Sequence, residues 1–392
     1  MKVAYVSDID IGMPNNANSI HVANMARLFH KAGFEVAAIC ESPKNGILLE
    51  NTEYVNYIYI KPIPGKGKIR GLNWNLNALL GYFSARETKR ILNEINPDYV
   101  IIHEANSMFY AQSVARLSKK LGYKVIVETT EWMEVGKERT PLYNCIIRQK
   151  DYSRRKLDRK CGNIIAISEF LEDYYKAQGC NVVRIPPLFP DMNANRHIER
   201  FHDKTDKAKI KLVFAGTLSS KDFLEPVLRT LLRINKESIQ IAFEVIGPDE
   251  KEIKNRIDVD DLKKYGIYCH GRISHDEVLE IVRKSDFSVL FRKNQRYAKA
   301  GVSTKFCEAM SEGVPSICTR VGGTDRFVMD GINGILIENN EETTIEMALR
   351  KLLELDDNKI IEMKNSAYHT ALENFSIDRY VVPLQNFIKN CY

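Results

Sequence analysis

The 392-residue sequence has no uninterrupted apolar run long enough to cross a bilayer, and its first residues, MKVAYVSD, lack the basic-then-apolar layout of a signal peptide. We therefore expect a cytoplasmic protein whose contact with a membrane is at most peripheral. Low-complexity tracts are absent too. Hydrophobic residues make up 44% of the chain and charged residues 28%, so we expect packed cores and disorder only in short loops.

Strong charge of one sign is also absent. Lys and Arg (57) exceed Asp and Glu (51) by six, a surplus that suits phosphate groups or an anionic membrane but is too small for a nucleic-acid-binding surface. The eight cysteines are scattered and never form a C-x-x-C pair. This pattern indicates reduced thiols in a reducing compartment and no structural zinc.

Short β-branched runs alternate with amphipathic helical stretches throughout the first half. Such alternation predicts a parallel sheet with helices on both faces. A helix is expected over residues 19–30, ending near Gly33. The strands expected in this half are KVAYVS (2–7), EVAAIC (35–40), YVIIH (99–103), KVIVE (124–128) and NIIAIS (163–168).

A polar stretch at 191–209 indicates a linker, after which the alternation restarts. The fold class expected is α/β, with two Rossmann-like domains at 1–190 and 210–374 facing each other across a cleft and a C-terminal helix, 375–392, packing back on the first. Ligands in such sheets bind beyond the carboxyl ends of the strands. The second series of strands is KLVFAG (211–216), IAFEVIG (241–247), GIYCH (266–270), FSVLF (287–291), PSICT (315–319) and GILIE (334–338).

A strongly basic loop follows the strand expected at 287–291. It holds five cations and no acidic residue from Arg292 to Lys305. Gly301 allows a close backbone approach or an unusual φ, and Ser303 or Thr304 is placed to cap the helix that follows. Cations beside a helix N-terminus predict a site for an anion such as a diphosphate.

The basic loop also has a non-functional explanation, and two other segments carry similar signals. In that explanation the loop is simply solvated, and Lys305 and Glu308 form an ordinary i,i+3 helix pair. The segment FAGTLSSKDF (214–223) adds Gly216 at a tight turn and Lys221 near the next helix. GRISHDE (271–277) adds one arginine, for which a plain surface role is equally open.

The order of these segments resembles the second domain of family 4 glycosyltransferases, which have the GT-B fold. The donor-binding signature of that family, K-x-x-E-A-M-x-x-G-x-P, is matched by KFCEAMSEGVP (305–315), and its downstream N-G by residues 333–334. In the first half, VAYVSDIDIG (3–12) resembles the opening strand and glycine loop, and NIIAISEFLEDYY (163–175) the strand and helix before the interdomain link. The resemblance covers nearly the whole chain and is strongest from 211 to 338.

The resemblance implies a retaining, metal-independent transfer of a hexose-type unit from a UDP- or GDP-sugar to a glycan or lipid-linked glycan. The pathway implied is assembly of a bacterial surface polysaccharide, such as lipopolysaccharide or capsule. Glu308 would accept hydrogen bonds from the ribose hydroxyls, and Gly12 would let the first domain approach the donor. Lys221, Lys305 and Arg292 would stabilise the leaving diphosphate. The other donor-binding positions implied are Gly216, Thr217, Arg272, Gly301, Ser303 and Thr304.

The sequence departs from the family pattern at three places. Ala300 stands where a second glutamate is frequent, and Thr217 where an arginine is common. Members with a similar A-G-x-x-T-K form occur among enzymes of bacterial surface polysaccharides. In the first half, Glu131 and Trp132 occupy the strand end where relatives often keep a histidine facing the sugar. Glu131 and His103, which closes YVIIH, are the catalytic candidates of this half, with a structural role open for both.

Two further kinds of sequence pattern bear on metal binding and membrane contact, and two other functions remain open. The D-x-D at 8–10, with a second copy at 258–260 in a stretch expected to be helical, is too isolated to predict a metal site, so we expect no metal or other cofactor. The basic stretches 148–160 and 62–71 suit an anionic lipid surface or are plain solvated faces. A nucleotide-sugar epimerase or hydrolase and a catalytically silent nucleotide-sugar-binding subunit remain alternatives.

Overall fold

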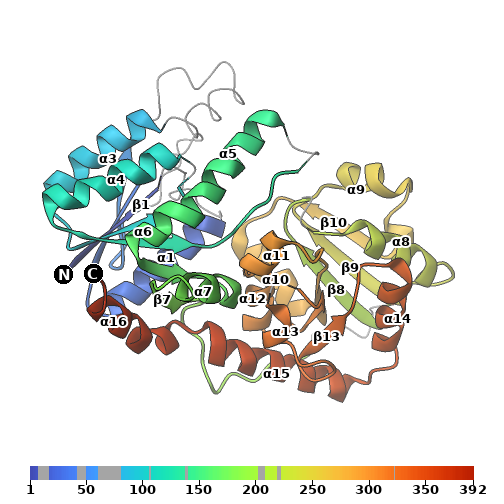
Figure 1. Cartoon of the computed structure of the whole chain (residues 1–392). Helices are drawn as coiled ribbons and strands as arrows, with labels where there is room; N and C mark the ends of the chain where they lie inside the picture. The colour runs from blue at the N-terminus through green and yellow to red at the C-terminus, as the bar shows by residue number, and fades with distance from the viewer. Residues whose placement is uncertain are drawn as a thin grey trace. The chain divides into compact units, whose positions relative to one another are not determined.

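The computed structural model describes residues 1–7, 17–41, 50–60, 81–105, 107–136, 140–201, 208–218, 222–321 and 323–392. The chain divides into two compact units (Figure 1). Unit 1 comprises Met1–Pro190 and Ile377–Tyr392, and unit 2 comprises Asp191–Ser376. Each is a parallel sheet with helices on both faces, which confirms the predicted α/β class with two Rossmann-like halves.

The described part of unit 1 contains a seven-stranded parallel sheet in the order β3-β2-β1-β4-β5-β6-β7. Its central strands are continuous β-branched runs because helices cover both of their faces. The strand order reverses between β1 and β4, where ligands of such sheets usually bind. The strands are β1 (Lys2–Val6), β2 (Glu35–Glu41), β3 (Asn56–Ile60), β4 (Tyr99–His103), β5 (Lys124–Thr129), β6 (Asn163–Ala166) and β7 (Asn181–Arg184).

Two apolar cores lie on the two faces of this sheet. Helix starts follow local capping, since the hydroxyls of Ser107, Thr140 and Ser168 accept backbone N–H groups of the helices they precede. The last helix packs against α1 and β7. The helices are α1 (Ala17–Lys31), α3 (Tyr82–Ile95), α4 (Met108–Leu121), α5 (Pro141–Tyr152), the π-helical η1 (Ser153–Asp158), α6 (Arg159–Cys161), α7 (Glu169–Lys176), η3 (Ile377–Tyr380) and α16 (Val381–Lys389).

Unit 2 has, among its described residues, a six-stranded parallel sheet in the order β10-β9-β8-β11-β12-β13. Asp249 and Ser274 each form a capping box with a glutamate three residues on. The strands are β8 (Ile210–Ala215), β9 (Ile241–Ile246), β10 (Ile267–Gly271), β11 (Phe287–Leu290), β12 (Ser316–Thr319) and β13 (Gly334–Ile337). The helices are α8 (Glu225–Ile234), α9 (Glu250–Ile257), η2 (Lys263–Tyr265), α10 (His275–Lys284), α11 (Arg296–Ala300), α12 (Thr304–Ser311), α13 (Thr324–Phe327), α14 (Glu342–Leu352) and α15 (Asp357–Phe375).

The stretch expected as a linker, 191–209, belongs to unit 2 in its described residues. The Asn365 side chain on α15 accepts the N–H of Ile198 at 3.1 Å and donates to its carbonyl at 3.0 Å. The buried Arg200 donates to Asp286 at 2.7 Å. Polar residues of this stretch therefore make hydrogen bonds within unit 2, whereas the sequence predicted a linker between the two domains.

The strands predicted in both halves are present, and two more were missed. These are β3 and β7, which lie at the two edges of the first sheet and carry half-buried side chains. All eight cysteines are free thiols, as expected. None of the helices in the described ranges combines the length and the apolar character that crossing a bilayer requires.

Candidate functional site

The predicted donor-binding residues of unit 2 gather at one edge of its sheet. Gly216 directly follows β8, Arg272 follows β10 and Arg292 lies two residues after β11. Because all six strands are parallel, their carboxyl ends share this edge. Thr217 and Arg272 are exposed there. The predicted Gly12 and Lys221 lie outside the described residues.

Two of the predicted cations converge on an aspartate that sequence reasoning missed. The Nζ atom of Lys305, on the first turn of α12, lies 2.6 Å from Oδ2 of Asp222, and Nε of Arg292 lies 3.0 Å from Oδ1. The Asp222 side chain is only 7% exposed. Burial alone would raise the pKa of Asp222, but the charges of Lys305 and Arg292 outweigh it and hold that pKa below its usual value. Lys305 therefore pairs with a residue outside its own helix.

Gly216 has no side chain, and this leaves the space that the Lys305 ammonium occupies. A Cβ added at Gly216 would lie 2.4 Å from the Lys305 Nζ atom. The ring of Phe214 lies on another side, with its centroid 4.5 Å from Nζ. Gly247, at φ +109°, is also required, because a Cβ there would lie 2.0 Å from the Gly216 carbonyl oxygen. The glycine turn after β8 thus serves to admit a cation.

The N-terminus of α12 differs in detail from the expectation. Ser303 is its N-cap, but neither Ser303 nor Thr304 makes a side-chain cap. The Ser303 hydroxyl is buried and has no hydrogen-bond partner within the described ranges. A buried hydroxyl without a hydrogen-bond partner is energetically costly. Gly301 has φ −102°, an ordinary value, so of the two reasons considered for a glycine here the unusual φ does not apply and the close backbone approach stays a prediction.

Glu308 lies one helical turn beyond Lys305. Burial raises the pKa of Glu308 to about 7, with a smaller contribution from the negative charge of Glu312. Its Oε1 atom lies 3.5 Å from Nε2 of His275, at the start of α10. Lys305 and Glu308 line one small pocket together with Ala215 and Leu290. A cation and a carboxyl group of variable charge therefore face the same space.

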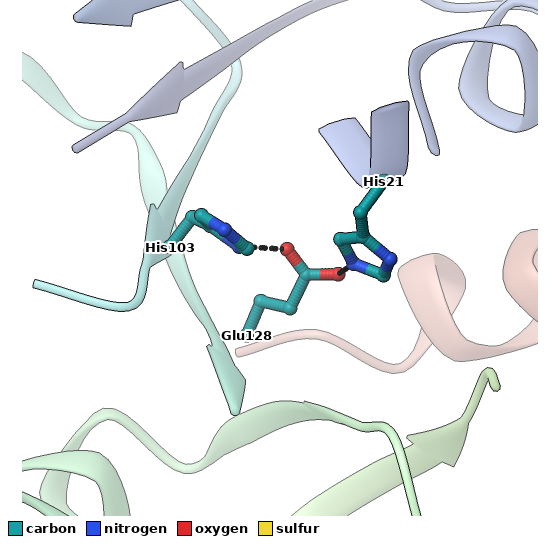
Figure 2. Close-up of side chains that lie close together, drawn as sticks. All are labelled: His21, His103 and Glu128. Carbon is teal, nitrogen blue, oxygen red and sulfur yellow. Dashed lines mark hydrogen bonds and ion pairs between the residues drawn. The ribbon is translucent and has the colours of Figure 1, made fainter. Parts of the chain in front are cut away.

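Unit 1 carries a buried cluster at the carboxyl ends of β4 and β5 (Figure 2). Glu128 lies between two imidazoles, with Oε2 2.6 Å from Nδ1 of His103 and Oε1 2.8 Å from Nε2 of His21. Burial would raise the pKa of Glu128, but the two histidines lower it to about 2. Burial would also lower the pKa of His21, and Glu128 reverses this so that the pKa is raised. The candidate His103 is thus at a strand end as predicted, but it is fully buried and paired.

The three residues of this cluster are of types that ligate metal ions. The nitrogen and oxygen atoms lie within 4.8 Å of one another, close enough for shared ligation. The two rings lie at 24° to each other with centroids 5.6 Å apart, and each ring pairs with its own oxygen of Glu128. Of the two D-x-D copies, 8–10 lies outside the described residues, and 258–260 follows the end of α9 at Ile257, contrary to the expected helix.

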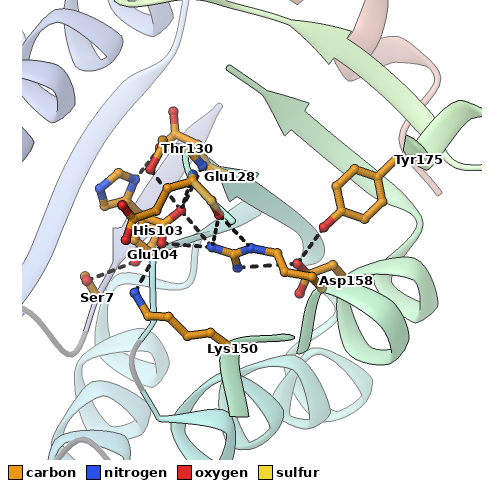
Figure 3. A network of polar contacts seen from close by, with 10 residues as sticks. Ser7, His103, Glu104, Glu128, Thr130, Lys150, Asp158 and Tyr175 are labelled. Carbon is orange, nitrogen blue, oxygen red and sulfur yellow. Dashed lines mark hydrogen bonds and ion pairs between the residues drawn. The ribbon is translucent and has the colours of Figure 1, made fainter. Parts of the chain in front are cut away.

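A second network in unit 1 fixes the loop after β5 (Figure 3). Glu104, at φ +42°, accepts the Thr130 N–H at 2.8 Å, the Thr130 hydroxyl at 2.9 Å and the Glu131 N–H at 3.3 Å. Arg154 donates to both oxygens of Glu104 at 2.8 Å and to the Glu131 carbonyl at 3.2 Å. Lys150 approaches the same carboxylate at 3.4 Å. The backbone of Glu131 is therefore fixed by charged hydrogen bonds.

Buried charges in this network depend on one another. Burial would raise the pKa of Glu104, but Arg154 and Lys150 hold it well below its usual range. Burial raises the pKa of Asp158, which lies 3.6 Å from Arg154 and accepts the Tyr175 hydroxyl at 2.9 Å. Trp132, expected at the sheet edge with Glu131, is instead buried against Tyr174. Its large apolar ring is removed from water by this packing.

The two halves of the chain match two different family models. Residues 209–355 match the family model described as glycosyl transferases group 1, and residues 10–155 match the model described as glycosyl transferase 4-like. The uncharacterized glycosyltransferase MJ1069 of Methanocaldococcus jannaschii is 26% identical over 230 residues, which are 56% of each chain. The chain thus spans little more than half the length of that relative.

Solved structures resemble the chain over its whole length. Sucrose-phosphate synthase from Thermosynechococcus elongatus has a TM-score of 0.70 at 12% identity, covering 99% of this chain and 98% of that one. Alr3699/HepE from Anabaena, in complex with UDP and glucose, has a TM-score of 0.64 at 13% identity, covering 100% of both. These similarities define a GT-B fold. With both family models matched, the chain belongs to the GT4-like glycosyltransferases, which confirms the resemblance noted from the sequence.

Proposed function

We propose that the protein is a retaining glycosyltransferase that transfers a hexose-type unit from a UDP- or GDP-sugar to a glycan or lipid-linked glycan. The observation that carries this proposal is the convergence of Lys305 and Arg292 on Asp222 at the edge of the second sheet, beside the start of α12, where Ser303 is the N-cap. Family membership supports the reaction class, and the relative HepE is in complex with UDP and glucose. The pathway proposed is assembly of a bacterial surface polysaccharide.

The chemistry proposed for this edge is stabilisation of a leaving diphosphate. Lys305 and Arg292 present positive charge where the bond between sugar and phosphate breaks, and partial burial strengthens their effect. Ser303 would give the phosphate a hydroxyl donor, and the Glu308 carboxyl would accept hydrogen bonds from the ribose hydroxyls. The acceptor hydroxyl would attack from the face that the diphosphate leaves, and a phosphate oxygen would take its proton.

A peripheral contact with the inner face of a membrane is part of the proposal. The helix of α5, η1 and α6 turns two of its cations inward, because Lys150 and Arg154 bind Glu104. Its outer face is basic and also exposes Tyr152. Basic side chains beside an aromatic ring suit an anionic lipid surface that carries a lipid-linked acceptor. The exposed cations are Arg148, Arg155, Lys156, Arg159 and Lys160.

The nucleotide specificity is tested by thermal unfolding of the full chain with UDP, GDP, ADP and CMP at millimolar concentration. A diphosphate that binds the folded state alone stabilises it by about 2.7 kcal/mol at one hundred times its Kd. We expect a raised Tm with UDP or GDP and little change with CMP, which has one phosphate. An equal response to CMP, or none to any diphosphate, would contradict the proposed site.

The proposed metal independence gives a separate prediction. Transfer measured after dialysis against EDTA is expected to keep its full rate, because Lys305 and Arg292 supply the positive charge that a metal would otherwise bring. Product formation from a radiolabelled donor gives the rate. Loss of activity that magnesium or manganese restores would show that a divalent cation is needed.

A further inference from the structure

We propose that Asp222 is a positioning residue that limits how tightly the site holds a nucleoside diphosphate. Its carboxylate keeps Lys305 and Arg292 side by side and cancels one of their two positive charges, so that the diphosphate product can leave. This inference rests on the proposed function of the same site. It adds a role for a residue that lies outside the matched donor-binding signature.

The contacts allow Asp222 and a diphosphate to share the two cations. Arg292 meets Asp222 through Nε at 3.0 Å, and a guanidinium has four further N–H donors. Lys305 meets the other carboxylate oxygen with one of its three N–H groups, at 2.6 Å. Two cations held close together repel each other unless an anion lies between them. Asp222 provides that anion before any donor arrives.

Backbone contacts hold Asp222 in place beside Arg292. The N–H of Phe223 donates to the Phe291 carbonyl at 2.9 Å, which ties the residue after Asp222 to the residue before Arg292. Lys293 lies over the Phe223 ring, 4.6 Å from its centroid. Thr319 accepts the Arg292 N–H at 2.9 Å and donates to the Arg292 carbonyl at 3.1 Å. The carboxylate is therefore a fixed charge of the site.

The charge of Asp222 acts differently on donor and product. Breaking the bond between sugar and phosphate frees an ester oxygen of the diphosphate, which takes the acceptor's proton; once this proton passes to water, the product carries one more negative charge than the donor. A site with two uncompensated cations favours the more negative species most, and this slows product release. With one charge cancelled, the pair still attracts the diphosphate but holds the product less tightly. Removing the charge of Asp222 should then strengthen product binding.

The test compares Asp222→Asn with the wild type by calorimetric titration of UDP and GDP. The neutral amide keeps the shape of the side chain, so we expect the Kd of the diphosphate to fall on the order of 10-fold. In steady-state transfer both KM for the donor and kcat should fall, because the product leaves more slowly. Asp222→Glu, which keeps the charge, should retain the wild-type Kd more closely than Asp222→Asn.

A matched control removes a negative charge elsewhere in unit 2. Glu346→Gln on α14 loses contacts to Arg233 at 2.9 Å and Arg350 at 2.8 Å, and the Kd should not change. If Asp222→Asn fails to fold, Asp222→Ser supplies a smaller neutral side chain with the same expectation. Unchanged or weaker binding in a folded neutral variant would overturn the inference and leave the proposed function standing. A wild type that binds no nucleoside diphosphate would overturn the proposed function and the inference with it.

Discussion

Replacing Lys305 by Ala is expected to lower the rate of sugar transfer on the order of 10²-fold, the usual effect of losing one preorganised contact to developing charge. The ammonium occupies a space made by Gly216 and Phe214 and is oriented by Asp222, so its position is fixed before the donor binds. Because the charge on the diphosphate grows as the bond breaks, we expect a larger effect on kcat than on KM for the donor. Initial rates over a range of donor concentrations separate the two.

The control for this variant is Lys284→Ala. Lys284 is an exposed lysine of α10 in the same unit and pairs with Glu280 on its own helix. Its loss changes the net charge of unit 2 by the same amount and should leave the rate close to that of the wild type. Equal rates for Lys305→Ala and the wild type would remove Lys305 from the mechanism. Equal losses in both variants would indicate a long-range effect of net charge.

The strands could be predicted from the sequence because the signal is local. A buried parallel strand is a run of β-branched residues, and β4, with all five residues buried, coincides with the predicted YVIIH. The missed β3 and β7 are edge strands whose half-buried side chains give no continuous run. The polar stretch 191–209 was misassigned for a related reason, since its hydrogen-bond partners, Asn365 and Asp286, lie far along the chain.

Some residues of the candidate site could be predicted from the local sequence, and others could not. Gly216, Arg292 and Lys305 were predicted because each follows a strand or begins a helix, which is visible in a short window. Asp222 was missed because its importance comes from partners 70 and 83 residues away. The Glu128 cluster is similar, since His21 lies 107 residues from Glu128. Sequence reasoning located the sheet edges, whereas the pairing of charges across them required the fold.

Replacing Arg154 by Met is expected to destabilise unit 1 by about 3 to 5 kcal/mol, the cost of removing one partner from a buried ion pair. The Arg154 side chain is 4% exposed and lies between Glu104 and Asp158, so the variant takes the guanidinium from two buried carboxyl groups, of which Glu104 keeps Lys150 at 3.4 Å. Met keeps much of the volume, so the effect is mainly electrostatic. Tryptophan fluorescence during urea unfolding reports on unit 1, because Trp132 is buried there and the sequence of unit 2 contains no tryptophan.

The adjacent Arg155 provides the control, because Arg155→Met removes the same charge one residue along the same helix. Arg155 is 49% exposed and pairs with Asp151, so its loss should change stability by roughly 0.5 kcal/mol or less.

The pH dependence of stability also distinguishes Arg154→Met from Arg155→Met. Arg154 and Lys150 hold the pKa of Glu104 in the folded protein below its usual value. The ionised Glu104 therefore stabilises the fold at pH values above the pKa that it has in the unfolded chain, and this stabilisation is lost as the pH falls. In Arg154→Met, Glu104 keeps Lys150 but loses its bidentate partner and takes up a proton more readily, so the deficit in stability relative to the wild type should shrink between pH 7 and pH 4. A deficit that is the same at both pH values, or that equals the deficit of Arg155→Met, would show that the Glu104 network does not stabilise unit 1 through its charges.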